Sequence, residues 1–248
     1  KVIVMPFPLN KKFFEKVTKT REEILGELGL DPERKTLLAT SGGQGIGDTS
    51  SYVKILYMRD FPFNIIAVCG KNQELFDELN KLKESGKSNV PMAVLGFVDN
   101  MHELLDVSDL AIAKGGASTT LEVLVKRVPT IFTHCAALHE KGNIDFCVDN
   151  KMGWFAKNEK EFSQIINKIL ITDILDQYKR NIEENEYIKT LPEASDNLAR
   201  FIVKELETPY VKSKRSKKVL LRAIVLGTRI NLYRLRSRSK NKRYKIND

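Results

Sequence analysis

Six short apolar runs, separated by segments with helical periodicity, constrain the fold of this chain more than any other feature. The runs lie at residues 36–40, 64–69, 92–97, 110–113, 130–133 and 153–156. Helices are predicted near residues 49–58, 72–84, 101–107, 118–126, 143–150, 159–171 and 194–207. Continuous apolar strands that alternate with helices are typical of a parallel sheet covered on both faces. The sequence therefore predicts an α/β fold, a doubly wound parallel sheet that binds ligands at the carboxyl ends of its strands.

The chain divides by composition into three parts. Residues 1–8 are apolar and broken by proline, and residues 11–28 favour a helix that Gly29 ends. Because the first residue is Lys1 rather than Met, we expect residues 1–34 to be a linker and helix that lead in from a preceding domain. Residues 35–208 are the α/β domain, and residues 209–248 form a basic tail.

The positive charge of the chain is concentrated in the tail. The formal net charge is +9, but residues 209–248 hold fourteen Lys or Arg and one acid, which leaves 27 basic and 31 acidic residues before them. The α/β domain is therefore slightly acidic, and any binding to a polyanion or a membrane surface is expected from the tail.

The cysteines and the apolar segments indicate the compartment. Cys69, Cys135 and Cys147 are odd in number and far apart, which predicts buried or incidental thiols in a reducing compartment rather than a disulfide frame or a zinc site. No secretory signal is visible, and the longest wholly apolar stretch of the tail, residues 223–226, is far shorter than the roughly 18 residues of a membrane span. We expect a cytoplasmic protein with at most a peripheral contact to the inner face of a membrane.

A first glycine-rich segment, SGGQGIG at residues 41–47, follows the first strand and precedes a helix. Glycines allow backbone N–H groups to approach a diphosphate, and the helix amino terminus attracts negative charge. Packing alone is the alternative explanation. The segment lacks the Gly-Lys-Ser/Thr of a phosphate-binding NTPase loop, and no acid ends the next strand as in a dinucleotide-binding fold.

A second segment, KGGASTTLE at residues 114–122, has two glycines and three hydroxyls at a predicted helix start. These groups can donate to phosphate oxygens, and Glu122, one turn into the helix, can accept hydrogen bonds from both hydroxyls of a ribose. The alternative is purely local, with Ser118 or Thr119 capping the helix and Glu122 completing a capping pair.

A third segment, LHEKGN at residues 138–143, follows the strand at residues 130–133. Its polar side chains, His139, Glu140 and Asn143, suit the hydroxyls of a hexose, because a hydrogen-bonding site rejects a sugar that leaves a buried polar group unpaired. The alternative is a solvated loop before a helix.

The stretch GGASTTLEVLVKRVPTIF, followed by HEKGNIDFCVDNKMGWF, resembles the carboxy-terminal donor domain of glycosyltransferase family 28. The Glu-Lys-Gly-Asn, Val-Asp-Asn and Gly pattern is most similar to galactosyl- and glucosyl-diacylglycerol synthases. The lipid-linked N-acetylglucosaminyltransferase of peptidoglycan synthesis is also similar but has a Gln pair where this chain has Lys141 and Gly142. The resemblance covers roughly residues 1–207.

This resemblance implies a Rossmann-like donor half of a GT-B enzyme that transfers a hexose from a UDP-sugar, with inversion, to a membrane lipid such as diacylglycerol. Uracil would be held by the backbone of Phe97 and Val98, the ribose by Glu122, and the transferred sugar by Glu140 and Asn143 beside His139. The donor diphosphate would lie against Gly42, Gly43, Gln44, Gly45, Gly116, Ala117, Ser118, Thr119 and Thr120. No Asp-x-Asp pair lies on a suitable loop, so neither a metal nor another cofactor is expected.

By the same resemblance, the general base belongs to an amino-terminal acceptor domain, and this chain begins where such a domain would end. The alternative function is a non-catalytic UDP-sugar-binding subunit that needs a separate acceptor-domain chain, and a weaker one is a UDP-sugar epimerase. The sugar and the acceptor stay open, because epimers differ by one hydroxyl.

The basic tail predicts a cationic amphipathic helix. Five cations fall within about one-sixth of a helical turn at 100° per residue, with apolar residues such as Ile224 and Leu232 around them. They are Arg215, Lys218, Arg222, Arg229 and Arg236. Such a helix suits an anionic membrane surface. The first alternative is a solvated or partner-docking tail. Nucleic-acid binding is the last alternative, because the tail also carries apolar residues.

Overall fold

The computed structural model describes residues 3–40, 49–135 and 138–207. The first glycine-rich segment, with Gly42, Gly43, Gln44 and Gly45, and the cationic tail lie outside these residues, so their predicted roles stay predictions. The chain divides into two units, Lys1–Phe201 and Ile202–Asp248. The first unit holds the sheet and the candidate site.

Six parallel strands form one sheet in the order β3-β2-β1-β4-β5-β6. The strands are β1 (Thr36–Thr40), β2 (Asn64–Val68), β3 (Met92–Leu95), β4 (Leu110–Lys114), β5 (Thr130–His134) and β6 (Gly153–Phe155). All five neighbouring pairs are parallel, and the order reverses between β1 and β4. The predicted doubly wound fold is confirmed, and every predicted strand is present within two residues of its expected end.

The helices follow the strands with some departures from prediction. They are α1 (Arg21–Glu27), α2 (Thr49–Met58), α3 (Gln73–Glu84), α4 (Met101–Asp106), α5 (Ala117–Val125), α6 (Leu138–Asp149), α7 (Glu159–Ile171), α8 (Ile174–Glu184), α9 (Glu186–Thr190) and α10 (Ala194–Glu207), with short 3-10 helices η1 (Lys11–Phe13) and η2 (Leu191–Glu193). Helices α8 and α9 were not predicted. Helix α6 begins five residues before its expected start, since burial of Ile144 and Cys147 outweighs the helix penalty of Gly142, about 1 kcal/mol.

The prediction of one helix over residues 11–28 is wrong. Only η1 and α1 form there, because Thr20 starts a new helix through a capping box: its hydroxyl accepts from the Glu23 N–H, and the Glu23 carboxylate accepts from the Thr20 N–H. Helix α1 is nevertheless part of the domain, as its Ile24 and Leu25 are buried in the same core as Leu38 of β1.

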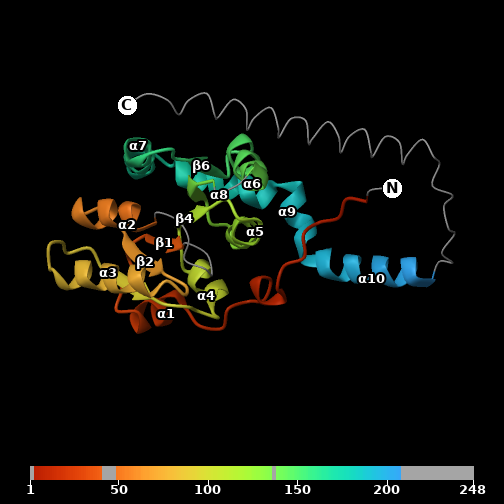
Figure 1. Cartoon of the computed structure of the whole chain (residues 1–248), viewed down its shortest axis with the longest axis horizontal. Helices are drawn as coiled ribbons and strands as arrows, with labels where there is room; N and C mark the ends of the chain where they lie inside the picture. Colours follow the sequence, from red (N-terminus) through yellow and green to blue (C-terminus); the bar gives the residue numbers. More distant parts are fainter. Residues whose placement is uncertain (1–2, 41–48, 136–137, 208–248) are drawn as a thin grey trace, which may run out of the picture. The chain divides into compact units, whose positions relative to one another are not determined.

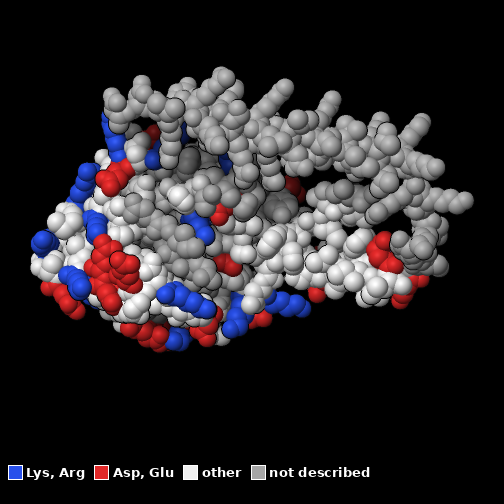
Figure 2. Space-filling view, viewed as in Figure 1, with Lys and Arg blue, Asp and Glu red and all other residues white. Residues whose placement is uncertain are grey.

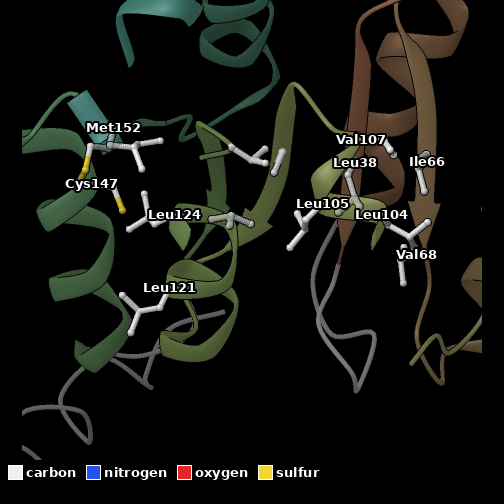
Figure 3. Packing of buried hydrophobic residues seen from close by; sticks show 14 of the residues in the cluster. Leu38, Ile66, Val68, Leu104, Leu105, Val107, Leu121, Leu124, Cys147 and Met152 are labelled. Atoms are coloured by element: carbon white, nitrogen blue, oxygen red, sulfur yellow. The ribbon is translucent and has the colours of Figure 1, made fainter. Parts of the chain in front are cut away.

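Helices cover both faces of the sheet (Figure 1), and alternate strand residues build one core on each face. Leu38, Ile66 and Phe132 pack with helices α1, α4, α5 and α6, while Leu37 and Ile65 pack with α2, α3 and α7. Figure 3 shows the first core, in which Leu104 and Leu105 of α4 approach the strands and Leu121 and Leu124 of α5 face Cys147 and Met152. This period of two, with both faces covered, explains why the strands are apolar throughout.

One carboxylate ties the amino-terminal edge of the sheet together. Asp109, before β4, accepts hydrogen bonds from the Thr36 N–H at 2.9 Å, from the Lys179 ammonium at 2.9 Å and from the Arg21 guanidinium at 3.2 Å. Burial alone would raise the pKa of Asp109, but these hydrogen bonds and the two cations outweigh it and lower the pKa. The site described next lies at the opposite edge.

Acidic and basic side chains lie intermingled on the face of the described residues that Figure 2 shows. None of the helices within residues 3–40, 49–135 and 138–207 is long and apolar enough to cross a bilayer. Membrane attachment through Arg215, Lys218, Arg222, Arg229 and Arg236 stays a prediction.

Candidate functional site

A cavity of about 220 Å³ opens at the carboxyl ends of β1 and β2, between α4 and α5. Its floor is formed by Thr40 and Val68 at the strand ends and by Gly70, whose φ of +61° supplies the left-handed turn after β2. Phe97 and Val98 form one wall. The cavity therefore lies at the edge where a doubly wound sheet binds its ligands.

Two patterns that are far apart in the sequence meet in this cavity. Phe97 and Val98 follow β3, whereas Thr119 and Glu122 lie on α5, and all four line the same space. Phe97 is 65% exposed, with the ammonium of Lys71 at 5.8 Å from its ring centroid. An aromatic ring held open to solvent beside a cation is available to a ligand.

Glu122 is the most unusual group of the cavity. Burial raises the pKa of its carboxyl group, and within the described part of the chain no hydrogen bond or ion pair to it is found. A half-buried carboxylate without a partner is costly, since it has lost water without gaining a donor. The arrangement suits a ligand that brings hydroxyl donors to this position.

The start of α5 leaves backbone amides available. Its N-cap is Gly116, which has no side chain to cap the helix, and the first intrahelical bond runs from the Thr120 N–H to the Gly116 oxygen at 2.9 Å. The alternative in which Ser118 or Thr119 caps the helix is therefore wrong. The amides of Ala117, Ser118 and Thr119 precede that first bond and, with the helix dipole, favour an anion.

The third sequence pattern is brought against the second. The Asn143 side-chain amide donates to the Gly115 oxygen at 2.8 Å, and a methyl group on Gly115 would lie 2.7 Å from Ile144 Cγ1 and 2.9 Å from the Glu140 backbone oxygen. Helix α6 thus packs directly on the loop between β4 and α5. A solvated loop at residues 138–143 is contradicted, because these residues are helical and Glu140 is only 6% exposed.

Two other predicted residues, Thr120 and His139, are not among the described residues that line the cavity. Thr120 is 2% exposed, and its hydroxyl has no hydrogen-bond partner among the residues described. His139 lies in the first turn of α6. Sequence reasoning missed Phe13, Thr40 and Met101, which also line the cavity; Phe13 carries no sequence signal for this, because it precedes the sheet by more than twenty residues.

The thiols behave as expected from the sequence. Cys69 and Cys147 are buried, and burial raises the pKa of Cys69 to about 11 and that of Cys147 to about 12. Both buried thiols therefore stay protonated and unreactive at neutral pH. Where the structure is described, no three His, Cys, Asp or Glu side chains gather into a metal-binding group.

Known structures share this fold. The chain is similar to MurG of Acinetobacter baumannii with a TM-score of 0.61 at 20% identity, over 75% of this chain and 53% of that one. It is also similar to HepE of Anabaena in complex with UDP, with a TM-score of 0.58 at 14% identity, over 79% of this chain and 56% of that one. The fold is that of the donor half of a GT-B glycosyltransferase.

The family follows from the sequence match. The model of the glycosyltransferase family 28 C-terminal domain matches residues 48–198, more than half of the chain, and the chain belongs to this family. It is 29% identical over 160 residues to monogalactosyldiacylglycerol synthase 1, chloroplastic, of Arabidopsis thaliana, over 62% of this chain and 29% of that protein. It is 29% identical over 206 residues to the probable monogalactosyldiacylglycerol synthase 3, chloroplastic, of Oryza sativa subsp. japonica, over 80% of this chain and 39% of that protein. The chain thus spans less than two fifths of the length of these relatives.

Proposed function

We propose that this chain binds a UDP-sugar in the cavity between α4 and α5 and is the donor half of an inverting glycosyltransferase that transfers a hexose to a membrane lipid such as diacylglycerol. The observation that carries the proposal is Glu122, a half-buried carboxylate that lines the cavity with no described partner. The two adjacent hydroxyls of a ribose would each donate to it and offset its desolvation.

The rest of the cavity agrees with this orientation. With the ribose at Glu122, the base would lie along the apolar walls near Phe97 and Val98. The diphosphate would then point to the start of α5, where the amides of Ala117 to Thr119 precede the first intrahelical bond. UDP leaves with added negative charge on its terminal phosphate, so the same amides and the helix dipole would stabilise the transition state more than the bound donor.

The lipid acceptor is proposed from the relatives, which are named as monogalactosyldiacylglycerol synthases. Transfer also needs a group that takes the proton from the acceptor hydroxyl, and among the described residues that line the cavity only Glu122 and Asp99 are ionisable. Glu122 is assigned to the ribose, and Asp99 directly follows the Phe97 and Val98 wall assigned to the base. We therefore place the general base in a separate acceptor-binding part, either in the same polypeptide or in a partner chain.

Calorimetric titration of the purified chain with UDP, UDP-galactose and UDP-glucose tests the proposal. Replacement Glu122→Gln should weaken binding of all three about 10-fold or more, because a charge-assisted hydrogen bond is worth roughly 1.5–3 kcal/mol. The matched control is Glu103→Gln on α4, since Glu103 is also half-buried but is paired with Asn100 and does not line the cavity. Absence of UDP binding by the wild-type chain, or equal losses in both variants, would refute the proposed site.

A further inference from the structure

Phe13 lies on η1, before the sheet begins, yet its ring lines the candidate nucleotide cavity together with Phe97, Val98 and Glu122. The ring is held from two sides. The short helix is fixed by Asn10, whose side chain accepts from the Lys12 N–H at 3.0 Å and whose backbone oxygen accepts from the Phe13 N–H at 3.1 Å. The ring itself meets His102 of α4 edge to face, with the centroids 6.2 Å apart.

A second cavity, of about 690 Å³, also borders Phe13. It is bordered by Phe14 and by residues of α5, α8 and α9. Phe13 lines both cavities, whereas its neighbour Phe14 lines only the larger one. Phe13 therefore belongs to the lining of both cavities, and it brings the amino-terminal segment into the wall of the smaller one.

The chemistry of the smaller cavity indicates what Phe13 faces. The apolar part of its lining includes Leu38, Val68 and Met101. A planar base suits this apolar part, where an aromatic wall adds favourable stacking or edge contact.

We propose that Phe13 is a further binding residue for the donor, with its ring forming the wall on which the base packs, so that the segment before the sheet is part of the donor site. This inference rests on the proposed function. It assigns a role in nucleotide recognition to a residue outside the glycine-rich and polar patterns of the sequence.

The test is calorimetric titration with UDP of the wild-type chain and of Phe13→Ala and Phe14→Ala. Base–aromatic contacts lose about five-fold or more in affinity on replacement by alanine, so Phe13→Ala should weaken UDP binding by at least that factor. Phe14→Ala should stay within about two-fold, although both rings are half-buried on the same core and both variants should lose similar thermal stability. Where Phe13→Ala fails to fold, Phe13→Leu keeps the apolar volume, loses the ring and should show a smaller loss in the same direction.

The outcomes separate the two proposals. In one outcome, the wild-type chain binds UDP and the folded Phe13 variants bind it with unchanged affinity; in another, the Phe13 and Phe14 variants lose affinity equally. Either outcome overturns the role of Phe13 and leaves the proposed function intact. Wild-type failure to bind UDP overturns both.

Discussion

Replacement of Gly115 should destabilise the fold, because the structure shows which atoms a side chain at this position would meet. A methyl group at this position would lie 2.7 and 2.8 Å from Ile144 Cγ1 and Cδ1 and 2.9 Å from the Glu140 backbone oxygen. Real carbon contacts are about 3.5–4.0 Å, so α6 would have to move away from the loop by several tenths of an ångström at least. Overpacking of this kind costs about 1–3 kcal/mol. For a domain of this size, Gly115→Ala should therefore lower the Tm by about 2–4 °C per kcal/mol lost.

The adjacent glycine is the matched control. Among the described residues, a methyl group on Gly116 would meet only the end of the Lys114 side chain, at 3.9 Å, and the φ of −64° at Gly116 is open to any residue. Gly116→Ala should lower the free energy of unfolding by about 0.5–1 kcal/mol, the cost of alanine at an N-cap, and by less than Gly115→Ala, measured by urea denaturation. Combining Gly115→Ala with Ile144→Val, which removes Cδ1, should recover part of the loss, whereas the Glu140 oxygen, being backbone, stays in the way. Equal destabilisation by the two Gly→Ala variants would refute the reasoning.

Two further predictions concern buried carboxylates. Asp109→Ala should destabilise the fold by about 2–4 kcal/mol, since it leaves the buried Thr36 N–H unpaired and removes the partner of Arg21 and Lys179. Because the pKa of Asp109 is lowered in the folded state, this contribution is present above the ordinary Asp pKa of about 3.9 and is lost as the pH falls through the lowered value. In urea denaturation, the difference in unfolding free energy between wild type and variant should therefore be smaller near pH 3 than at pH 7. Glu122→Gln should have the opposite effect, because the pKa of Glu122 is raised and its ionised carboxylate destabilises the folded state once the pH rises above the ordinary value of about 4.3. The variant should therefore have a higher Tm than wild type at pH 7 but not at pH 4. A Tm difference that does not change with pH would contradict the burial argument.

The sheet could be predicted from the sequence because its strands are buried on both faces. In β1, all five residues are buried, and the apolar run ends where the strand ends. Helix α8 was not predicted, although Ile174, Leu175, Tyr178 and Ile182 recur at helical spacing. The stripe is short and lies in a mostly polar segment, of whose eleven residues only Leu175 and Ile182 are buried.

The topology of the sheet predicts where the site lies but not every residue that lines it. Residues that follow β3 and β4 meet at one edge of a parallel sheet, and Phe97 and Glu122 are found in one cavity there. Glu122 is predicted from its place at a helix start after a strand, whereas Phe97 is predicted from the family resemblance. Phe13 could not be predicted, because its position depends on a new helix starting at Thr20 and on the contact with His102, neither of which is periodic in the sequence.

The glycine pair at residues 115 and 116 shows why sequence patterns alone do not assign roles to single residues. Both glycines stand in one motif, yet a side chain at Gly115 would collide with Ile144, whereas among the described residues a methyl group on Gly116 would meet only the Lys114 side chain, at 3.9 Å. The structure thus gives a packing reason for glycine at position 115 but not at position 116. The same division applies to Asn143, whose amide nitrogen is used to hold Gly115, leaving its carbonyl oxygen for a ligand. A donor sugar at this site would therefore bind to a surface whose geometry is set by the packing of α6 on the loop before α5.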